Sequence, residues 1–128
     1  MKLLFDTHTL LWFLSDDPKL SAVAKTAIVD PANERWLSPI SLLEIALKVR
    51  IGKLPLQAPF GTLFPNQLTV NRIQLLAIDV PHVAAVAVMP LHHRDPFDHL
   101  IIAQAMIEGM TLLSAETTFD AYGVTRLW

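Results

Sequence analysis

The feature that most constrains the fold is an alternation of short apolar runs with longer segments of helical periodicity. The runs predicted as strands are "KLLF" (2–5), "ERWLS" (34–38), "IQLLAID" (73–79), "MTLLS" (110–114) and "VTRL" (124–127). Helical spacing, caps and breakers predict helices over 8–15, 20–30, 41–50, 81–89 and 96–108, with a weak helix over 62–71 interrupted by Pro65. Strands that alternate with helices favour an α/β domain with a mainly parallel, doubly wound sheet covered on both faces.

Length and composition narrow the class of protein. A chain of 128 residues without repeats or linkers suits one compact domain, so we expect residues 1–128 to form a single unit. The hydrophobic fraction of 52% supplies a full core and can leave apolar surface for a partner. The net charge of -2 excludes an overall basic field, so any contact with nucleic acid must be local.

The sequence also indicates where the protein works. The absence of cysteine removes disulfides and thiolate metal sites and fits a reducing compartment. Asp6 and His8 interrupt the apolar N-terminal run, so we do not expect a signal peptide. No apolar run reaches the ~20 residues of a membrane helix. We therefore expect a cytoplasmic protein with no membrane partner.

Five acidic residues occupy positions that this fold would bring together. Asp6 directly follows the first strand, Glu44 lies in the first turn of the helix predicted over 41–50, and Glu116 follows the strand 110–114. Asp95 and Asp98 stand at the start of the helix 96–108. Parallel strands end at one edge of the sheet, the next helices begin there, and ligands bind in the crevice at that edge. We expect the acids to gather at this edge.

Each acid alone also has a structural explanation. Asp95 suits the N-cap of a helix that begins with Pro96, and Asp98 in the first turn is favoured by the helix dipole. Ser41 and Glu44 match a capping box. Asp6 fits such an explanation least, because it directly follows a buried strand.

The acids as a group require a different explanation. Ionised carboxylates within ~4–6 Å of each other repel, and one would take up a proton unless a cation neutralised them. Ligands that are all oxygen suit Mg²⁺ or Mn²⁺. Such a metal supports hydrolysis of phosphodiester bonds.

Four segments of the chain resemble a known family. They read "LLFDTHTLLWFLSDD", "SPISLLEIALKVRIGKLPL", "LHHRDPFDHLIIAQA" and "LLSAETTFDAYGV", and they resemble, in order, the acid-bearing segments of PIN-domain ribonucleases. The closest likeness is to VapC-type toxins of bacterial type II toxin–antitoxin systems. It runs from residue 2 to about 124, and four segments in order with suitable gaps are specific evidence.

The resemblance implies a three-layer α/β/α sandwich with a five-stranded parallel sheet. It also implies an Mg²⁺- or Mn²⁺-dependent endoribonuclease, usually a homodimer, that a cognate antitoxin inhibits. Asp6, Glu44 and Asp98 match the first three acids of the family, whereas Glu116 stands where aspartate is more common. Asp6 and Asp98 would hold the metal directly, and Glu44 and Glu116 would complete the site. Asp95 would act as a cap that could also reach the metal.

Other polar and aromatic side chains are candidates for supporting roles. Contacts to RNA phosphates are expected from Lys48, Arg50, Lys53 and Arg94, although cations also suit solvated helix ends. The hydroxyls of Thr7 and Ser114 could bond an acid or a phosphate. The histidines at 8, 92, 93 and 99 are weaker candidates, because single histidines are more often packed or exposed. Trp12 is expected in the core or in a partner groove.

Two other functions fit parts of the sequence. "FDTHT" after a strand also resembles haloacid-dehalogenase-type phosphatases, in which an aspartate is the nucleophile. That motif places a second aspartate two residues on, where this chain has His8, so the general acid is missing. A non-catalytic protein-binding module would use the acids only as caps. The chain has no GxGxxG, P-loop, GxSxG or HExxH motif.

Overall fold

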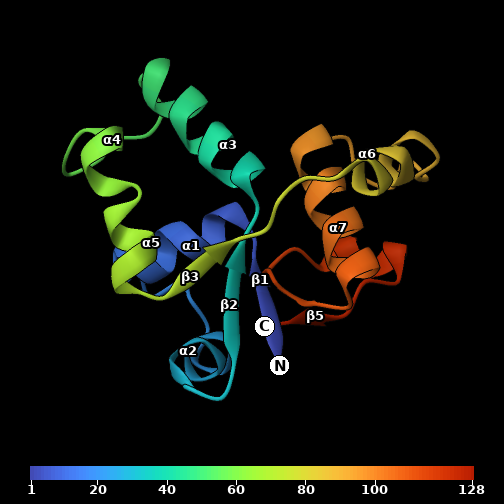
Figure 1. Cartoon of the computed structure of the whole chain (residues 1–128), viewed down its shortest axis with the longest axis horizontal. Helices are drawn as coiled ribbons and strands as arrows, with labels where there is room; N and C mark the ends of the chain where they lie inside the picture. The colour runs from blue at the N-terminus through green and yellow to red at the C-terminus, as the bar shows by residue number, and fades with distance from the viewer.

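Five short strands form one sheet in which every neighbouring pair runs parallel (Figure 1). The computed structural model describes residues 1–128. The strands are β1 (Lys2–Phe5), β2 (Glu34–Leu37), β3 (Ile73–Leu75), β4 (Thr111–Leu113) and β5 (Arg126–Leu127), in the order β3-β2-β1-β4-β5. The predicted parallel, five-stranded α/β sheet is therefore confirmed.

Seven α-helices and one 3₁₀ helix connect the strands. They are α1 (Thr7–Leu14), α2 (Ala22–Val29), α3 (Pro39–Arg50), α4 (Phe60–Leu63), α5 (Asn66–Val70), α6 (Val80–Ala87), α7 (Pro96–Glu108) and the 3₁₀ helix η1 (Thr117–Tyr122). Pro65 separates α4 from α5, and Gly109 ends α7 with φ +64°, both as the sequence predicts. None of these helices combines the length and the apolar character needed to cross a bilayer.

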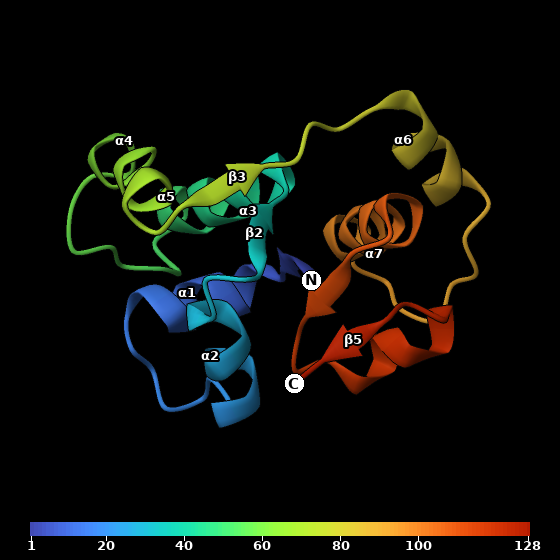
Figure 2. The same ribbon diagram turned by 60° about the horizontal axis from the view of Figure 1, so that its bottom comes forward.

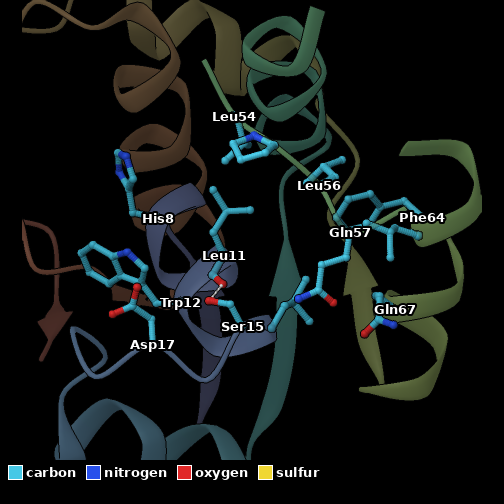
Figure 3. A pocket seen from close by; sticks show the side chains of 13 residues that line it. His8, Leu11, Trp12, Ser15, Asp17, Leu54, Leu56, Gln57, Phe64 and Gln67 are labelled. Atoms are coloured by element: carbon cyan, nitrogen blue, oxygen red, sulfur yellow. Dashed lines mark hydrogen bonds between the residues drawn. The ribbon is translucent and has the colours of Figure 1, made fainter. Parts of the chain in front are cut away.

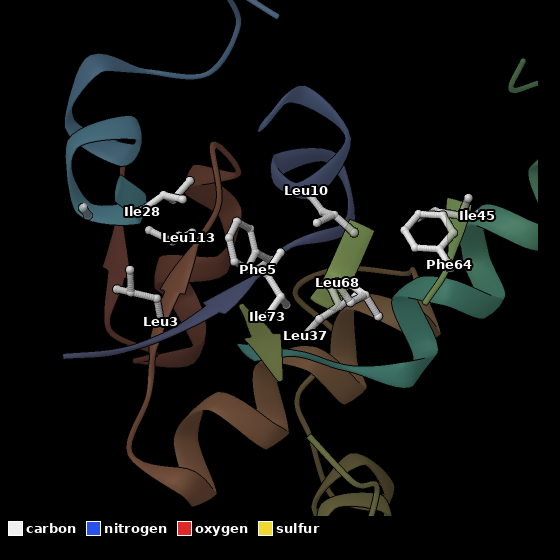
Figure 4. Packing of buried hydrophobic residues seen from close by; sticks show 11 residues of the cluster. Leu3, Phe5, Leu10, Ile28, Leu37, Ile45, Phe64, Leu68, Ile73 and Leu113 are labelled. Carbon is white, nitrogen blue, oxygen red and sulfur yellow. The ribbon is translucent and has the colours of Figure 1, made fainter. Parts of the chain in front are cut away.

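Alternation along the strands divides the core into two clusters. Leu3 and Phe5 of β1 face a cluster that takes in Leu10 of α1 and residues of α2, α3 and α5 (Figure 4). Leu4 points the other way, into a cluster with Ile101 of α7 and Phe119 of η1. Helices thus cover both faces of the sheet, which confirms the three-layer arrangement (Figure 2).

The register places the carboxyl ends of the central strands side by side. Phe5, the last residue of β1, aligns with Leu37 of β2 and with Leu113 of β4. The chain leaves β1 into a helix on one face and leaves β4 into η1 on the other. A crevice forms where neighbouring strands lead to opposite faces, and here it lies between β1 and β4.

Several predicted boundaries differ from those of the structure, and two of the differences have identifiable reasons. Helix α3 begins at Pro39 instead of Ser41, because Ser38 is the N-cap and its hydroxyl accepts a 3.2 Å hydrogen bond from the Ile40 N–H. Glu44 therefore lies beyond the first turn and forms no capping box with Ser41. Strand β3 covers three residues instead of seven, because its one partner β2 ends at Leu37.

Candidate metal centre

Asp6 lies at the bottom of the crevice between β1 and β4. Its backbone N–H donates to the Leu113 carbonyl at 3.0 Å, and its side chain begins α1 as the N-cap. The carboxylate is almost fully buried, with Oδ1 accepting from the Thr7 N–H at 2.7 Å and Oδ2 accepting from the Ser114 hydroxyl at 2.8 Å. The Ser114 hydroxyl thus bonds an acid, one of the two roles that the sequence allowed.

Glu44 reaches the same region from α3. Its carboxylate is 6% exposed, and Oε1 accepts from the Thr7 hydroxyl at 2.9 Å. Oε2 pairs with the Lys48 ammonium at 2.9 Å, one turn further along α3. The Thr7 and Ser41 hydroxyl oxygens are also 2.9 Å apart, so a buried polar contact joins α1 to α3 beside Asp6.

Asp98 enters the site from the first turn of α7. The predicted cap is confirmed, because the Asp95 carboxylate accepts a 2.9 Å bond from the Phe97 N–H. Asp98 Oδ2 lies 2.7 Å from His93 Nε2. Ligand atoms of His93, Asp95 and Asp98 all lie within 4.8 Å of one another.

The acids influence one another's pKa values. Burial raises the pKa of Asp6, and the charge of Glu44 raises it further. Hydrogen bonds from Ser114 and Thr7 lower this pKa but do not cancel the rise. Burial, followed by the charges of Asp6 and Asp95, raises the pKa of Asp98 to about 7. The carboxylates are therefore close enough to disfavour one another's charge.

This arrangement fits a divalent cation. Lys48 is the ammonium that pairs with the site, and its partner is Glu44. The raised pKa values show that no protein cation neutralises Asp6 and Asp98 fully. Carboxylate oxygens are the ligands that Mg²⁺ and Mn²⁺ prefer, and Asp98 has a second acid, Asp95, within 4.8 Å and feels the charge of Asp6.

His93 is one of the four histidines that the sequence offered only as weaker candidates, and the structure places it in the site. Its ring bonds Asp98, and its backbone N–H donates to the Tyr122 hydroxyl at 2.9 Å. The His99 ring bonds the His93 carbonyl and lies 3.2 Å from the Tyr122 hydroxyl. His93 precedes Asp98 by five residues in a loop, so no helical periodicity links the two positions.

The remaining predicted residues lie nearer the rim. Glu116 is exposed, and its N–H donates to the Ser114 hydroxyl at 3.1 Å, while its carboxylate makes no hydrogen bond. Lys48 joins the site through Glu44, whereas Arg50 lies about 9 Å from Glu44 along the axis of α3. Lys53 follows the end of that helix, and Arg94 is exposed next to Asp95 without an ion pair.

A second group of possible ligands has a structural role. Asp79, His82 and Glu108 also gather within 4.8 Å. The Asp79 N–H donates to His82 Nδ1 at 2.9 Å, so the ring proton sits on Nε2, which donates to Glu108 Oε1 at 2.9 Å. Both ring nitrogens of His82 make hydrogen bonds within the protein, and through them His82 links the start of α6 to the end of α7.

Comparison with known proteins gives one family and a set of similar structures. The family model described as PIN domain matches residues 3–124. No curated protein matches the sequence.

Three solved structures illustrate the likeness. VapBC2 from Rickettsia felis, bound to a DNA fragment from its promoter, has a TM-score of 0.74 at 14% identity, with 98% of this chain and 97% of that chain covered. DNA-bound VapBC from Salmonella typhimurium has a TM-score of 0.71 at 16% identity, covering 98% and 96%. A toxin–antitoxin complex from Klebsiella pneumoniae has a TM-score of 0.60 at 19% identity, covering 93% and 90%. At these identities the likeness is one of fold.

Proposed function

The chain belongs to the PIN domain family, and we propose that it is an Mg²⁺- or Mn²⁺-dependent endoribonuclease, the VapC-type toxin of a toxin–antitoxin pair. One observation carries this proposal: Asp6 and Asp98 come from elements on opposite faces of the sheet, and burial raises the pKa of both, with the charge of Glu44 adding to the rise at Asp6 and the charges of Asp6 and Asp95 adding to the rise at Asp98. A bound cation would favour the ionised form of both acids. Residues 1–128 would form the single nuclease domain.

The proposed metal ligands are the acids at the crevice. Asp6 and Asp98 would hold the ion directly, and Glu44, Glu116 and Asp95 would complete its surroundings. A divalent ion bound there would polarise a phosphoryl oxygen and lower the pKa of its water, which is the chemistry of phosphodiester hydrolysis. Asp98, with a pKa of about 7, would release a proton as the ion binds.

The surrounding side chains would keep the acids in place. The Ser114 hydroxyl and the Thr7 N–H fix both oxygens of Asp6. The Thr7 hydroxyl fixes Glu44, and the His93 ring fixes one oxygen of Asp98. Partners that orient metal ligands in this way govern affinity for the ion.

The substrate would be held by local positive charge. Lys48 and Arg94 lie nearest the acids, and Arg50 and Lys53 would reach phosphates further along the strand. Phosphate contacts of this kind position RNA without reading its sequence. The net charge of -2 makes such local contacts necessary.

The toxin role is supported by the proteins that share the fold. The similar structures are described as VapBC and as a toxin–antitoxin complex. We therefore propose a cognate antitoxin as partner and a homodimer as the assembly. Because the substrate is cellular RNA, we expect the protein in the cytoplasm.

The direct test is cleavage of total RNA by the purified protein with and without Mn²⁺. We expect cleavage with Mn²⁺, none with EDTA, and loss of cleavage in Asp6→Asn and Asp98→Asn. Asp16→Asn is the matched control, because Asp16 is exposed and its φ of 52° is one that asparagine tolerates. Folded Asp6→Asn protein with wild-type cleavage would refute the proposal.

The rival functions give different results in the same assays. A phosphatase would hydrolyse small phosphomonoesters and carry a covalent phosphate on Asp6. If the protein were a binding module, the wild type would not cleave RNA, and it would bind Mn²⁺ no more tightly than the Asp6→Asn variant does. For the toxin role, co-expression of the cognate antitoxin should relieve growth arrest caused by the wild-type chain.

A further inference from the structure

Three aromatic rings form a row beside the candidate metal centre. The ring centroids of His8 and Trp12 are 5.8 Å apart, and those of Trp12 and Trp128 are 5.7 Å apart. His8 and Trp12 stand one turn apart on α1, so they share one side of the helix (Figure 3). Trp128 comes from the other end of the chain. We call these residues the aromatic row.

The fold places this row at the same edge of the sheet as the acids. α1 begins directly after Asp6, and His8 is the second residue of that helix. The charge of His8 acts on Asp6 and opposes the rise in its pKa. Trp128 follows β5, whose carboxyl end lies two strand spacings from β1, about 10 Å along the edge. The row therefore starts at the acids and leads away from them.

The rings are available to a ligand. His8 is exposed, Trp12 and Trp128 are half-buried, and neither of these two indole N–H groups donates a hydrogen bond within the protein. The Lys19 ammonium lies 6.0 Å from the Trp12 ring centroid and has no ion pair. Trp36, in contrast, packs against the core cluster of α7 and η1. Accessible rings with a free cation are the components that bind single-stranded nucleic acid.

We propose that the aromatic row of His8, Trp12 and Trp128 stacks against bases of single-stranded RNA next to the phosphate held at the acids. This inference rests on the proposed ribonuclease function. RNA that is cut as a single strand has unstacked bases, and aromatic side chains bind such bases through their faces. Lys19 would contact a phosphate of the stacked nucleotide. The row would thus hold the strand beside the cleavage point.

A protein segment is the competing occupant. His8 and Trp12 also line one wall of a groove of ≈ 430 Å³, whose other walls include Leu11, Leu54 and Phe64 (Figure 3). Those walls are apolar and would suit an apolar segment of a partner. The position of the row at the acid site and the unpaired ammonium of Lys19 favour RNA for the rings themselves.

The test compares a short single-stranded RNA with the same strand carrying abasic riboses. Binding is measured in Asp6→Asn protein, which is expected to hold RNA without cutting it. We expect the intact strand to bind more tightly than the abasic strand. Adding Trp12→Ala should weaken binding of the intact strand by about tenfold or more and leave the abasic strand almost unchanged. Trp12→Phe should restore most of the difference.

Two controls separate the possible results. Trp36→Phe, which alters an indole away from the row, should bind both strands as its parent does, and circular dichroism should show that Trp12→Ala protein is folded. In the otherwise wild-type enzyme, Trp12→Ala should raise KM more than it lowers kcat.

Other results would contradict either base stacking or the nuclease proposal. Base stacking would be overturned if the intact and abasic strands bound equally, or if Trp12→Ala weakened the binding of both strands equally. Mn²⁺-dependent cleavage in the same preparation would still support the nuclease proposal. Unchanged RNA binding by Trp12→Ala protein, together with weaker binding of the cognate antitoxin, would make the row a protein-docking surface and overturn this inference. Absence of RNA cleavage by wild-type protein would refute the nuclease proposal itself.

Discussion

The hydroxyl of Ser114 donates a 2.8 Å hydrogen bond to Asp6 across 108 positions of sequence. This bond joins the carboxyl ends of β1 and β4 at the point where the chain leaves them toward opposite faces of the sheet. The Ser114 hydroxyl also accepts from the Glu116 N–H, so one side chain orients an acid and the turn after β4. Ser114 is completely buried, so water cannot replace it readily.

We predict that Ser114→Ala weakens Mn²⁺ binding by about tenfold or more, because it frees an oxygen of a proposed ligand. The bond from Ser114 lowers the pKa of Asp6, so its loss should raise that pKa further and favour the protonated acid. Calorimetric titration with Mn²⁺ measures the effect. Ser15→Ala is the control, because Ser15 is exposed and its hydroxyl bonds only the Leu11 carbonyl. Unaltered Mn²⁺ affinity in folded Ser114→Ala protein would contradict this role.

We predict that the metal-free protein loses stability as pH rises from about 4 through 7. The pKa of Asp98 is about 7 in the folded protein against 3.8 in the unfolded chain, so the folded state binds more protons in that range. The free energy of unfolding therefore falls with pH where this group titrates. Urea unfolding in EDTA at several pH values measures the trend.

Asp98→Asn should remove this part of the pH dependence. It should also make the metal-free protein more stable at pH 8 by about 1 kcal/mol, because a buried negative charge near Asp6 is gone. Excess Mn²⁺ should stabilise the wild type much more than the variant. A variant with the wild-type slope of stability against pH would show that Asp98 does not titrate as proposed.

We predict that His93→Ala weakens Mn²⁺ binding by about tenfold, because Asp98 loses the ring that fixes its Oδ2. His92→Ala serves as the neighbouring control: His92 is exposed and packs its ring against Tyr122 without contacting an acid. Both variants should be compared by Mn²⁺ titration and thermal unfolding. Equal Mn²⁺ affinities in the two variants would remove His93 from the site.

Local patterns predicted the elements but not all of their limits. The run "IQLLAID" is apolar throughout, but a strand extends only as far as its partner, and β2 ends at Leu37. Ser41 and Glu44 have capping-box spacing, yet Ser38 followed by Pro39 makes the stronger helix start. The correct start gives Glu44 a buried position that faces Thr7.

Some residues of the candidate site could be predicted from the sequence, whereas one of its contacts could not. Asp6, Asp98 and Glu44 could be assigned to one edge from the sequence because parallel strands all end there. Asp95 could be predicted as a cap because capping is local, and its bond to the Phe97 N–H confirms it. The contact between His93 and Asp98 depends on how Tyr122 and His99 hold the loop, and only tertiary structure gives that.

The span between Asp6 and Ser114 has a consequence for synthesis on the ribosome. A growing chain that has reached α3 already contains Asp6 and Glu44 but has neither α7 nor β4. Without them it lacks Asp98 and the hydroxyl that orients Asp6. The proposed nuclease site therefore stays incomplete on the ribosome until α7 and β4 have been synthesised.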